Sequence, residues 1–332
     1  MKSVISRRLA SLFLGLASLG IFQTAAMAQA DAYPNKPIKL IITWPVGGFA
    51  DTLGRTVANQ LGPILGQQIV VENRGGANGM IGADAVAKAA PDGYTLMFQS
   101  VTSHAINPTM YSKTPYSTEK DIVPLAVIAQ VPMLLVANPN LAAKNIAELI
   151  ALAKKEPDTL AYASFGNGSA SHLAGALLTN QAGIKMMHIP YKGGGPAITD
   201  TLGGQVPMSF SAFGVALPHV KSGKLIALGT TGPTRAKLLP DVPTIEESGN
   251  LKGYEMSIVY AVWAPAGMPA PIVSKLTKAL EQVVASSAFK EKVTNDGGEV
   301  MNLSTPAESN AYFQKEMQRL SKIVKDGNIK AD

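Results

Sequence analysis

A strand, a glycine turn and a helix start follow one another in residues 38–52, which read IKLIITWPVGGFADT. Ile38 to Thr43 is an apolar run with β-branched residues, which is typical of a buried strand. Gly47 and Gly48 then allow a tight turn, and apolar residues recur at helical spacing after them. The segment therefore predicts a strand, a loop of exposed backbone amides and a helix over 48–65.

The same alternation continues toward the C-terminus. Strands over 68–71 and 94–99, around a helix over 79–89, complete a βαβαβ unit of the doubly wound kind. A second series of this type follows later. Its expected helices cover 146–155, 171–181, 196–203 and 215–222, and its expected strands cover 160–164, 186–189, 207–212 and 225–230. The sequence therefore predicts an α/β fold with parallel sheets covered by helices.

Two extended segments, 123–137 and 256–264, flank the second series, and each is expected to cross between two lobes. The predicted first lobe comprises residues 29–130 and 256–332, and the second comprises residues 131–255. Each lobe has a doubly wound sheet, and the two crossing strands join them into a clamshell with a cleft. In open parallel sheets, ligands bind at the loops beyond the carboxyl ends of the strands.

Residues 1–28 are typical of a cleaved secretory signal. Lys2, Arg7 and Arg8 precede a stretch of fourteen apolar and small residues, which is too short to span a bilayer. Ala26-Met27-Ala28 then offers a cleavage site. The mature chain is therefore expected in a bacterial periplasm.

Composition excludes several functions. The 332 residues include 29 Lys and Arg against 23 Asp and Glu, for a net charge of +6. Three positive charges lie in the signal, so the mature chain carries +3 without a basic run, and no nucleic acid partner is expected. The absence of cysteine excludes disulfides, thiolate metal sites and a lipid anchor on an N-terminal cysteine. The four histidines lack metal-ligand spacing, so neither a metal nor a cofactor is predicted.

Strand-to-helix loops carry the candidate ligand-binding residues. They offer glycine amides and neutral hydroxyls at helix starts, the groups that hold an anion. One of them, 100–107, is predicted to be a loop directly after a strand. Paired acids do not occur in these loops, which favours holding a carboxylate over transforming it, so no catalytic residue is predicted. The candidates are Trp44, Pro45, Val46, Gly47, Gly48, Ser100, Thr102, Ser164, Asn167, Gly168, Ser169, Ser171, Gly193, Gly194 and Phe213.

Other interpretations of the same loops remain open. Ser169 or Ser171 with His172 would suit a secreted serine hydrolase, although the Gly-x-Ser-x-Gly elbow is absent. A ligand-sensing partner of a membrane signalling protein would use the same pocket as a transport receptor. His104 is predicted to pack or to cap, and Asp51 to support the start of its helix rather than contact an anion.

Several motifs occur in one order along the mature chain. They are Tyr33-Pro34-x-Lys36-Pro37-Ile38, Pro45-x-Gly47-Gly48-x-x-Asp51, Val71-Glu72-Asn73-Arg74-x-Gly76-Ala77, Pro91-Asp92-Gly93-Tyr94, Tyr191-Lys192-Gly193-Gly194, Leu239-Pro240-Asp241-Val242-Pro243-Thr244 and Glu247-x-Gly249. In this combination the sequence closely resembles the Bug family of periplasmic solute-binding proteins, the receptors of tripartite tricarboxylate transporters.

The resemblance implies a periplasmic-binding-protein fold whose two hinged lobes close on a small carboxylated molecule and deliver it to a membrane permease without catalysis. By position, the Pro45–Gly48 turn would bind one end of the ligand and the Ser164–Ser171 loop another carboxylate, with Gly193-Gly194 closing the second lobe. The family's first loop commonly reads Phe-Pro-Ala-Gly-Gly. Trp44 and Val46 replace two of these residues, which favours an aromatic acid or an apolar carboxylate or dicarboxylate over an amino acid. The receptor is expected to be a monomer.

Overall fold

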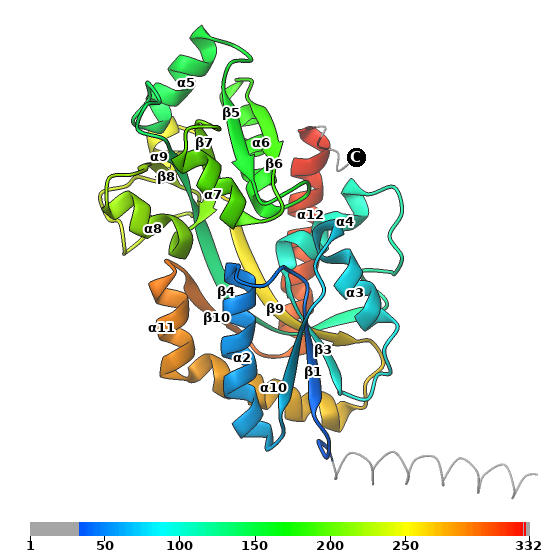
Figure 1. The fold of residues 1–332 in the computed structure, drawn as a ribbon. Helices are drawn as coiled ribbons and strands as arrows, with labels where there is room; N and C mark the ends of the chain where they lie inside the picture. Colours follow the sequence, from blue (N-terminus) through cyan, green and yellow to red (C-terminus); the bar gives the residue numbers. More distant parts are fainter. Residues whose placement is uncertain (1–32, 328, 330–332) are drawn as a thin grey trace, which may run out of the picture.

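The computed structural model describes residues 33–327 and 329, so the predicted signal at 1–28 lies outside the described residues. Its strands form one continuous path in the order β2-β1-β3-β9-β4-β7-β5-β6, and β8 and β10 also pair with β4. Helices cover this path, and its two ends form two lobes around the long strand β4 (Ile122–Ala137) (Figure 1). The predicted two-lobed α/β fold is confirmed.

The first lobe contains the strand–turn–helix segment quoted above. Its strands are β1 (Ile38–Ile42), β2 (Ile69–Asn73), β3 (Thr95–Ser100), β9 (Ser257–Pro265) and β10 (Glu299–Leu303). Its helices are α2 (Phe49–Leu65), η1 (Ala77–Gly79), α3 (Met80–Ala87), α4 (Val101–Met110), α10 (Ala270–Ala285), α11 (Ser287–Asn295) and α12 (Pro306–Asp326). Strands β2, β1 and β3 are parallel neighbours in that order, the arrangement of a doubly wound unit.

The second lobe repeats this order. Its strands are β5 (Ala161–Ser164), β6 (Met187–Pro190), β7 (Met208–Ala212) and β8 (Ile226–Thr230). Its helices are α5 (Ile146–Lys155), α6 (Ala170–Ala182), α7 (Gly194–Leu202), α8 (Phe213–Lys221) and α9 (Ile245–Gly249). Strands β6, β5 and β7 are parallel neighbours, as β2, β1 and β3 are in the first lobe.

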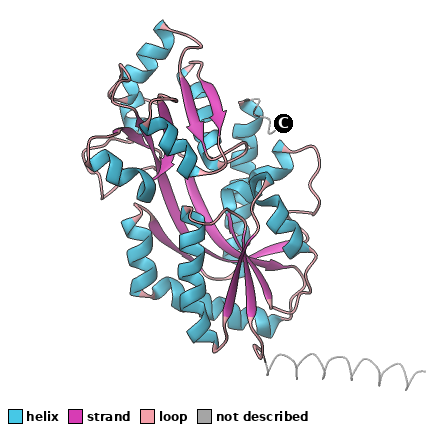
Figure 2. Cartoon of the chain, viewed as in Figure 1, coloured by secondary structure: helices cyan, strands magenta, loops and turns pink. Residues whose placement is uncertain are grey.

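Strand β4 belongs to both lobes. Its residues Ile122–Pro132 pair with β9, and Met133–Ala137 pair with β7 and β8. Strand β9 pairs within the first lobe. The chain returns from the second lobe to β9 at Met256, and the Met256 amide donates to the Thr231 carbonyl (2.9 Å). All pairs made by β4, β9 and β10 are antiparallel, so the sheets are mixed rather than parallel throughout (Figure 2).

The C-terminal helices return to the first lobe. Helices α10 and α11 pack against α2, and α12 packs against α4 and β4 (Figure 1). Strand β9 between these layers is buried along its whole length. Among the residues described, no helix combines the length and the apolar character that a membrane span requires.

The prediction of a loop at 100–107 is wrong, because a helix begins immediately after β3. The Ser100 hydroxyl accepts the Ser103 amide (3.2 Å), a side-chain cap that starts α4 without a connecting loop. Residues 101–107 are almost completely buried. Packing therefore stabilises as a helix a segment whose polar composition is typical of a loop.

Candidate functional site

A cavity of about 330 Å³ lies between the two lobes, which is at the small end of the usual range for ligand sites. Both lobes contribute to its wall. The lining residues are Trp44, Pro45, Val46, Gly47, Gly48, Phe49, Ala50, Ser100, Ser103, Ile258 and Tyr260 from the first lobe, and Phe165, Ser169, Ala170, Lys192, Gly193, Gly194, Gly195, Pro196, Ala212 and Val215 from the second.

Five helices of the described chain begin at this cavity, namely α2 and α4 from the first lobe and α6, α7 and α8 from the second. Their N-cap residues all line it: Gly48, Ser100, Ser169, Gly193 and Ala212. Each helix N-terminus carries a partial positive charge of about half a unit. Of the described lining side chains, Lys192 alone is charged. The cavity is therefore electropositive.

The five N-termini differ in how their amides are used. Ser100 caps α4 as described above, and the Ser169 hydroxyl caps α6 by accepting the His172 amide (3.3 Å). Within the described part of the chain, no side chain caps α2, α7 or α8. Because first-turn amides lack a partner inside their own helix, those of α2 and α7 are available to an anion, whereas the buried Asp296 carboxylate already lies against Gly214 in the first turn of α8.

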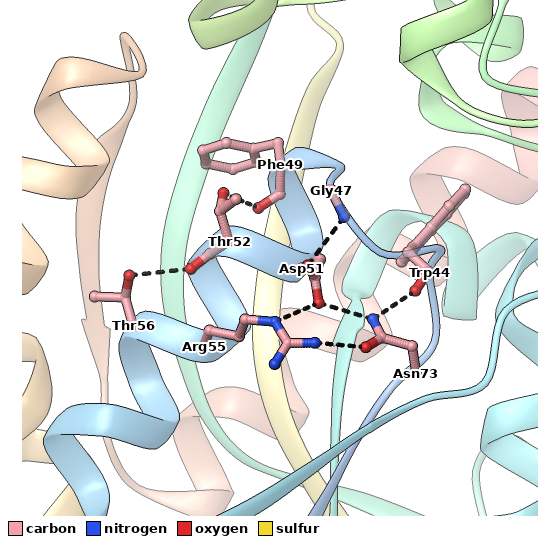
Figure 3. A network of polar contacts seen from close by, with 8 residues as sticks. All are labelled: Trp44, Gly47, Phe49, Asp51, Thr52, Arg55, Thr56 and Asn73. Carbon is pink, nitrogen blue, oxygen red and sulfur yellow. Dashed lines mark hydrogen bonds and ion pairs between the residues drawn. The ribbon is translucent and has the colours of Figure 1, made fainter.

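The loop before α2 is held by one buried carboxylate (Figure 3). Asp51 Oδ2 accepts the Gly47 amide (3.0 Å), and its Oδ1 accepts Arg55 Nε (3.0 Å) and Asn73 Nδ2 (2.8 Å). Asn73 Nδ2 also donates to the Trp44 carbonyl (3.0 Å). These bonds fix both ends of the turn, and they confirm that Asp51 supports the start of its helix.

The charge of Asp51 is stabilised inside this network. Burial raises the pKa of its carboxyl, but the hydrogen bonds from Gly47, Asn73 and Arg55 and the charge of Arg55 together outweigh burial, so the pKa lies below its usual value. Both carboxylate oxygens already accept hydrogen bonds. The negative charge of Asp51 therefore stabilises the turn before α2.

Trp44 presents its ring to the cavity from the first lobe. Its Nε1 donates to Gln99 Oε1 (3.1 Å), which also accepts the Ser100 amide (3.1 Å) and the Thr43 hydroxyl. The only polar atom of the indole is therefore engaged, and the remaining surface that the ring offers a ligand is apolar. Val46 at the tip of the same turn is 71% exposed.

The loop between β5 and α6 is shaped by its own serines. Ser171 Oγ accepts the Phe165 amide (2.8 Å), and Ser169 Oγ donates to the Gly166 carbonyl (2.7 Å). The two hydroxyl oxygens lie 2.9 Å apart. These bonds hold the loop in place and present Phe165 and the Ser169 backbone to the cavity.

Two stacked histidine rings, 3.8 Å apart, support that loop. His172 Nδ1 accepts the Gly168 amide (3.2 Å), and His188 Nε2 lies 2.6 Å from Ser164 Oγ. Burial lowers the pKa of His172 to about 4, and burial with the neighbouring His172 lowers the pKa of His188 to about 3. Both rings are neutral at neutral pH. Because His172 Nδ1 faces a backbone amide, its contacts give no support to a serine–histidine catalytic pair.

Part of the predicted site lines the cavity and part does not. The predicted residues that line it are Trp44, Pro45, Val46, Gly47, Gly48, Ser100, Ser169, Gly193 and Gly194. Those that lie outside its wall are Thr102, Ser164, Asn167, Gly168, Ser171 and Phe213.

Two of the residues outside the wall have clear structural roles. Thr102 Oγ1 donates to the Ser257 carbonyl (3.2 Å) and accepts the Val259 amide (3.4 Å), so it joins α4 to β9. Phe213 is completely buried and lies against Gly297, where an added Cβ would stand 2.6 Å from the Phe213 ring. The Phe213 ring therefore packs against the first lobe, although the residue itself opens α8 next to the cavity.

Several lining residues were not predicted from the sequence. They are Phe49, Ala50, Ser103, Phe165, Ala170, Lys192, Gly195, Pro196, Ala212, Val215, Ile258 and Tyr260. Most of them neighbour predicted residues in the same loops. Ile258 and Tyr260 lie on β9, and their spacing of two places them on one face of that strand, a periodicity that the sequence does contain.

Two α/β lobes around a cleft lined by helix N-termini define the class of periplasmic solute-binding proteins. The chain belongs to the tripartite tricarboxylate transporter receptor family, since the family model described as "Tripartite tricarboxylate transporter family receptor" matches residues 53–329. This confirms the resemblance found in the sequence. Members of this family are solute-binding receptors.

Individual relatives are similar over almost the whole chain. The Bordetella pertussis protein BugT is 36% identical over 98% of this chain and 99% of its own. The solved periplasmic binding protein BugD is 34% identical with a TM-score of 0.82, covering 90% of this chain and 99% of its own. An R. palustris protein solved with adipate is 31% identical with a TM-score of 0.84, covering 90% of this chain and 99% of its own.

Proposed function

We propose that this protein captures a small carboxylate, either a dicarboxylate or an aromatic acid, for a membrane permease of the tripartite tricarboxylate type. The observation that carries the proposal is the convergence of five helix N-termini on a cavity whose described lining includes no acidic side chain. Such a cavity attracts a carboxylate, and the uncapped amides of α2 and α7 supply its hydrogen bonds.

These contacts are strong enough for a transport receptor. A helix N-terminus contributes about 0.3–1 kcal/mol to an exposed anion, and a hydrogen bond to a charged group contributes about 1.5–3 kcal/mol. A few such bonds support a dissociation constant in the micromolar range after the cost of association. The R. palustris protein with adipate, and MatC from Rhodopseudomonas palustris with bound malate (30% identical, TM-score 0.81), support the choice of a carboxylate.

Capture would work by closure of two lobes, which we assign to residues 29–130 with 256–332 and to residues 131–255. The change of partners along β4 between Pro132 and Met133 supports this division. Because the uncapped helices come from both lobes, a ligand that binds both α2 and α7 favours the closed arrangement through its higher affinity for that arrangement.

The rest of the proposal concerns the export of the protein and the delivery of its ligand. The chain is exported to the periplasm, residues 1–28 are removed, and the mature receptor acts as a monomer that delivers its ligand to the permease. It performs no catalysis, holds no cofactor and binds no nucleic acid. The carboxylate-bound relatives and the family of transporter receptors support this role.

The test is a calorimetric and thermal-shift screen of the mature protein against mono-, di- and tricarboxylates, aromatic acids and amino acids. We expect a dicarboxylate or an aromatic acid to bind with a dissociation constant below about 100 μM. A Gly48→Asp variant, which places a negative charge at the N-terminus of α2, serves as the matched control with weakened binding. If no acid binds the unaltered protein this tightly, the uptake role is contradicted.

A further inference from the structure

The residues that line the cavity constrain the body of the ligand as well as the charge of the ligand. Apart from glycines, three serines and Lys192, every described lining residue has an apolar or aromatic side chain. The aromatic surface comes from both lobes, with Trp44 on one side and Phe165 on the other. The body of the ligand therefore meets carbon on most sides.

The aromatic walls are held in place. Phe165 packs against Gly194, where an added Cβ would lie 3.2 Å from the ring. Tyr260 stacks on Phe98 with ring centres 5.4 Å apart, and it also contacts Phe49 at 5.5 Å. Rings fixed in this way do not turn aside to make room for a polar substituent and its water.

Few side-chain polar atoms of the cavity remain for a ligand. Ser100 Oγ accepts the Ser103 amide, and Ser169 Oγ donates to Gly166 and accepts the His172 amide, so the Ser103 and Tyr260 hydroxyls are the remaining uncharged polar side-chain groups of the described wall. Lys192 is a cation and repels a ligand ammonium group. No described lining side chain carries the negative charge that a ligand ammonium group needs as its partner.

On the premise that the proposed function holds, we propose that this receptor selects carboxylates whose body bears neither an amino nor a hydroxyl group. An ammonium group would be buried without a counter-charge, and a hydroxyl group would face a wall that is carbon on most sides. An apolar pocket rejects an added hydroxyl by about 10²-fold, and a charged group is rejected more strongly.

The experiment compares acids that share one carbon skeleton. The mature protein is titrated calorimetrically with 3-phenylpropanoate, 3-phenyllactate and phenylalanine, and in parallel with adipate, 2-hydroxyadipate and 2-aminoadipate. The unsubstituted acid of at least one series is expected to bind at least about tenfold more tightly than its hydroxy acid, and still more tightly than its amino acid. Equal or tighter binding of a hydroxy or amino acid overturns the inference. If no member of either series and no acid of the broad screen binds, the proposed function itself fails.

A pair of variants tests the proposed discrimination against amino acids by changing the protein instead of the ligand. Val215→Asp adds the missing negative charge to the second-lobe wall, and Val215→Asn adds a neutral side chain of nearly the same shape. The Asp variant should shift the preference toward the amino acid by at least about tenfold relative to the Asn variant. An identical preference in the two variants, with unaltered circular dichroism spectra, contradicts the inference.

Discussion

The Asp51 carboxylate receives hydrogen bonds from the turn, from α2 and from β2, so one side chain joins three elements next to the cavity. Its partner Arg55 also donates to Asn73 Oδ1 (2.8 Å), which closes the network. The carboxylate itself is buried. The three hydrogen bonds to it are part-buried, so removing the charge weakens all of them together.

We expect Asp51→Asn to weaken carboxylate binding about tenfold and to lower the free energy of unfolding by about 1–3 kcal/mol. Asn keeps the size of the side chain but replaces one accepting oxygen with a donor, so the turn before α2 loses its fixed shape. Calorimetry and urea unfolding measure the two effects. Lys322→Ala is the control, because it breaks only an exposed ion pair with Asp326 and should change stability by less than about 0.5 kcal/mol. Unchanged affinity in Asp51→Asn would show that the network does not position the turn.

His104 carries a second prediction for a single residue. It is completely buried beside the rings of Tyr116, Trp263 and Phe313, and burial lowers its pKa from 6.5 to about 3. The unfolded chain takes up a proton near pH 6.5, whereas the folded chain does not until about pH 3. The stability contributed by the neutral ring is therefore complete above pH 6.5 and is lost as the pH falls from there toward 3.

Replacing this ring with Phe should flatten the acid side of the stability profile. His104→Phe removes one titrating group, so between pH 6.5 and 4 its free energy of unfolding should fall less steeply, by about 1.4 kcal/mol per pH unit, than that of the unaltered protein. Urea unfolding at several pH values measures the slope. Tyr116→Phe, which keeps the imidazole, should retain the original slope. A slope in His104→Phe as steep as that of the unaltered protein refutes the prediction.

At the scale of elements, α2 begins at a glycine where a capping residue would be more usual. Gly48 has an ordinary extended backbone (φ −77°, ψ 168°), and the nearest atom to an added Cβ is the Pro45 carbonyl oxygen at 3.7 Å. A side chain therefore fits there. Under the proposed function, the uncapped start leaves the first-turn amides of α2 to the ligand.

Gly48→Asp tests whether this helix start serves binding at the expense of stability. The new carboxylate can cap α2 and should raise the free energy of unfolding by a few tenths of a kcal/mol, while it competes with the ligand for the same amides. We expect at least about tenfold weaker carboxylate binding by calorimetry. Gly48→Ala, which adds the Cβ without the acceptor, is the matched control and should retain most of the affinity. Equal losses in the two variants would indicate a steric effect instead.

Most elements were predictable from local signals, and the exceptions depend on tertiary contacts. The helix expected at 146–155 matches α5, whose N-terminus is capped by Asn145. Helix α4 was missed because its polar residues are typical of a loop, and the helix is explained by the Ser100 cap together with burial against β9 and α12. In the site, the glycine turns can be recognised from the sequence alone. Ile258 and Tyr260 reach the cavity because β9 pairs with β3 and β4, and this pairing depends on residues far away in the chain.

At the scale of the whole molecule, the two lobes also meet outside the cavity. Gly214 lies in the first turn of α8 in the second lobe, and Asp296 follows α11 in the first. A Cβ added at Gly214 would overlap Asp296 Oδ1. Asp296 is buried and its Oδ2 is held by Lys292 Nζ (2.6 Å), so the carboxylate is not free to swing away. The glycine thus permits the close approach of the two lobes.

Gly214→Ala should therefore push the lobes apart and oppose closure. We expect a larger radius of gyration by small-angle X-ray scattering and about tenfold weaker ligand binding, because the ligand must then work against the overlap. The double variant Gly214→Ala with Asp296→Ala removes the opposing carboxylate and should recover both quantities. Gly203→Ala, where an added Cβ makes only ordinary contacts, should behave like the unaltered protein. If the double variant stays as open and as weak as Gly214→Ala alone, the added methyl acts inside α8 and the contact between lobes does not control closure.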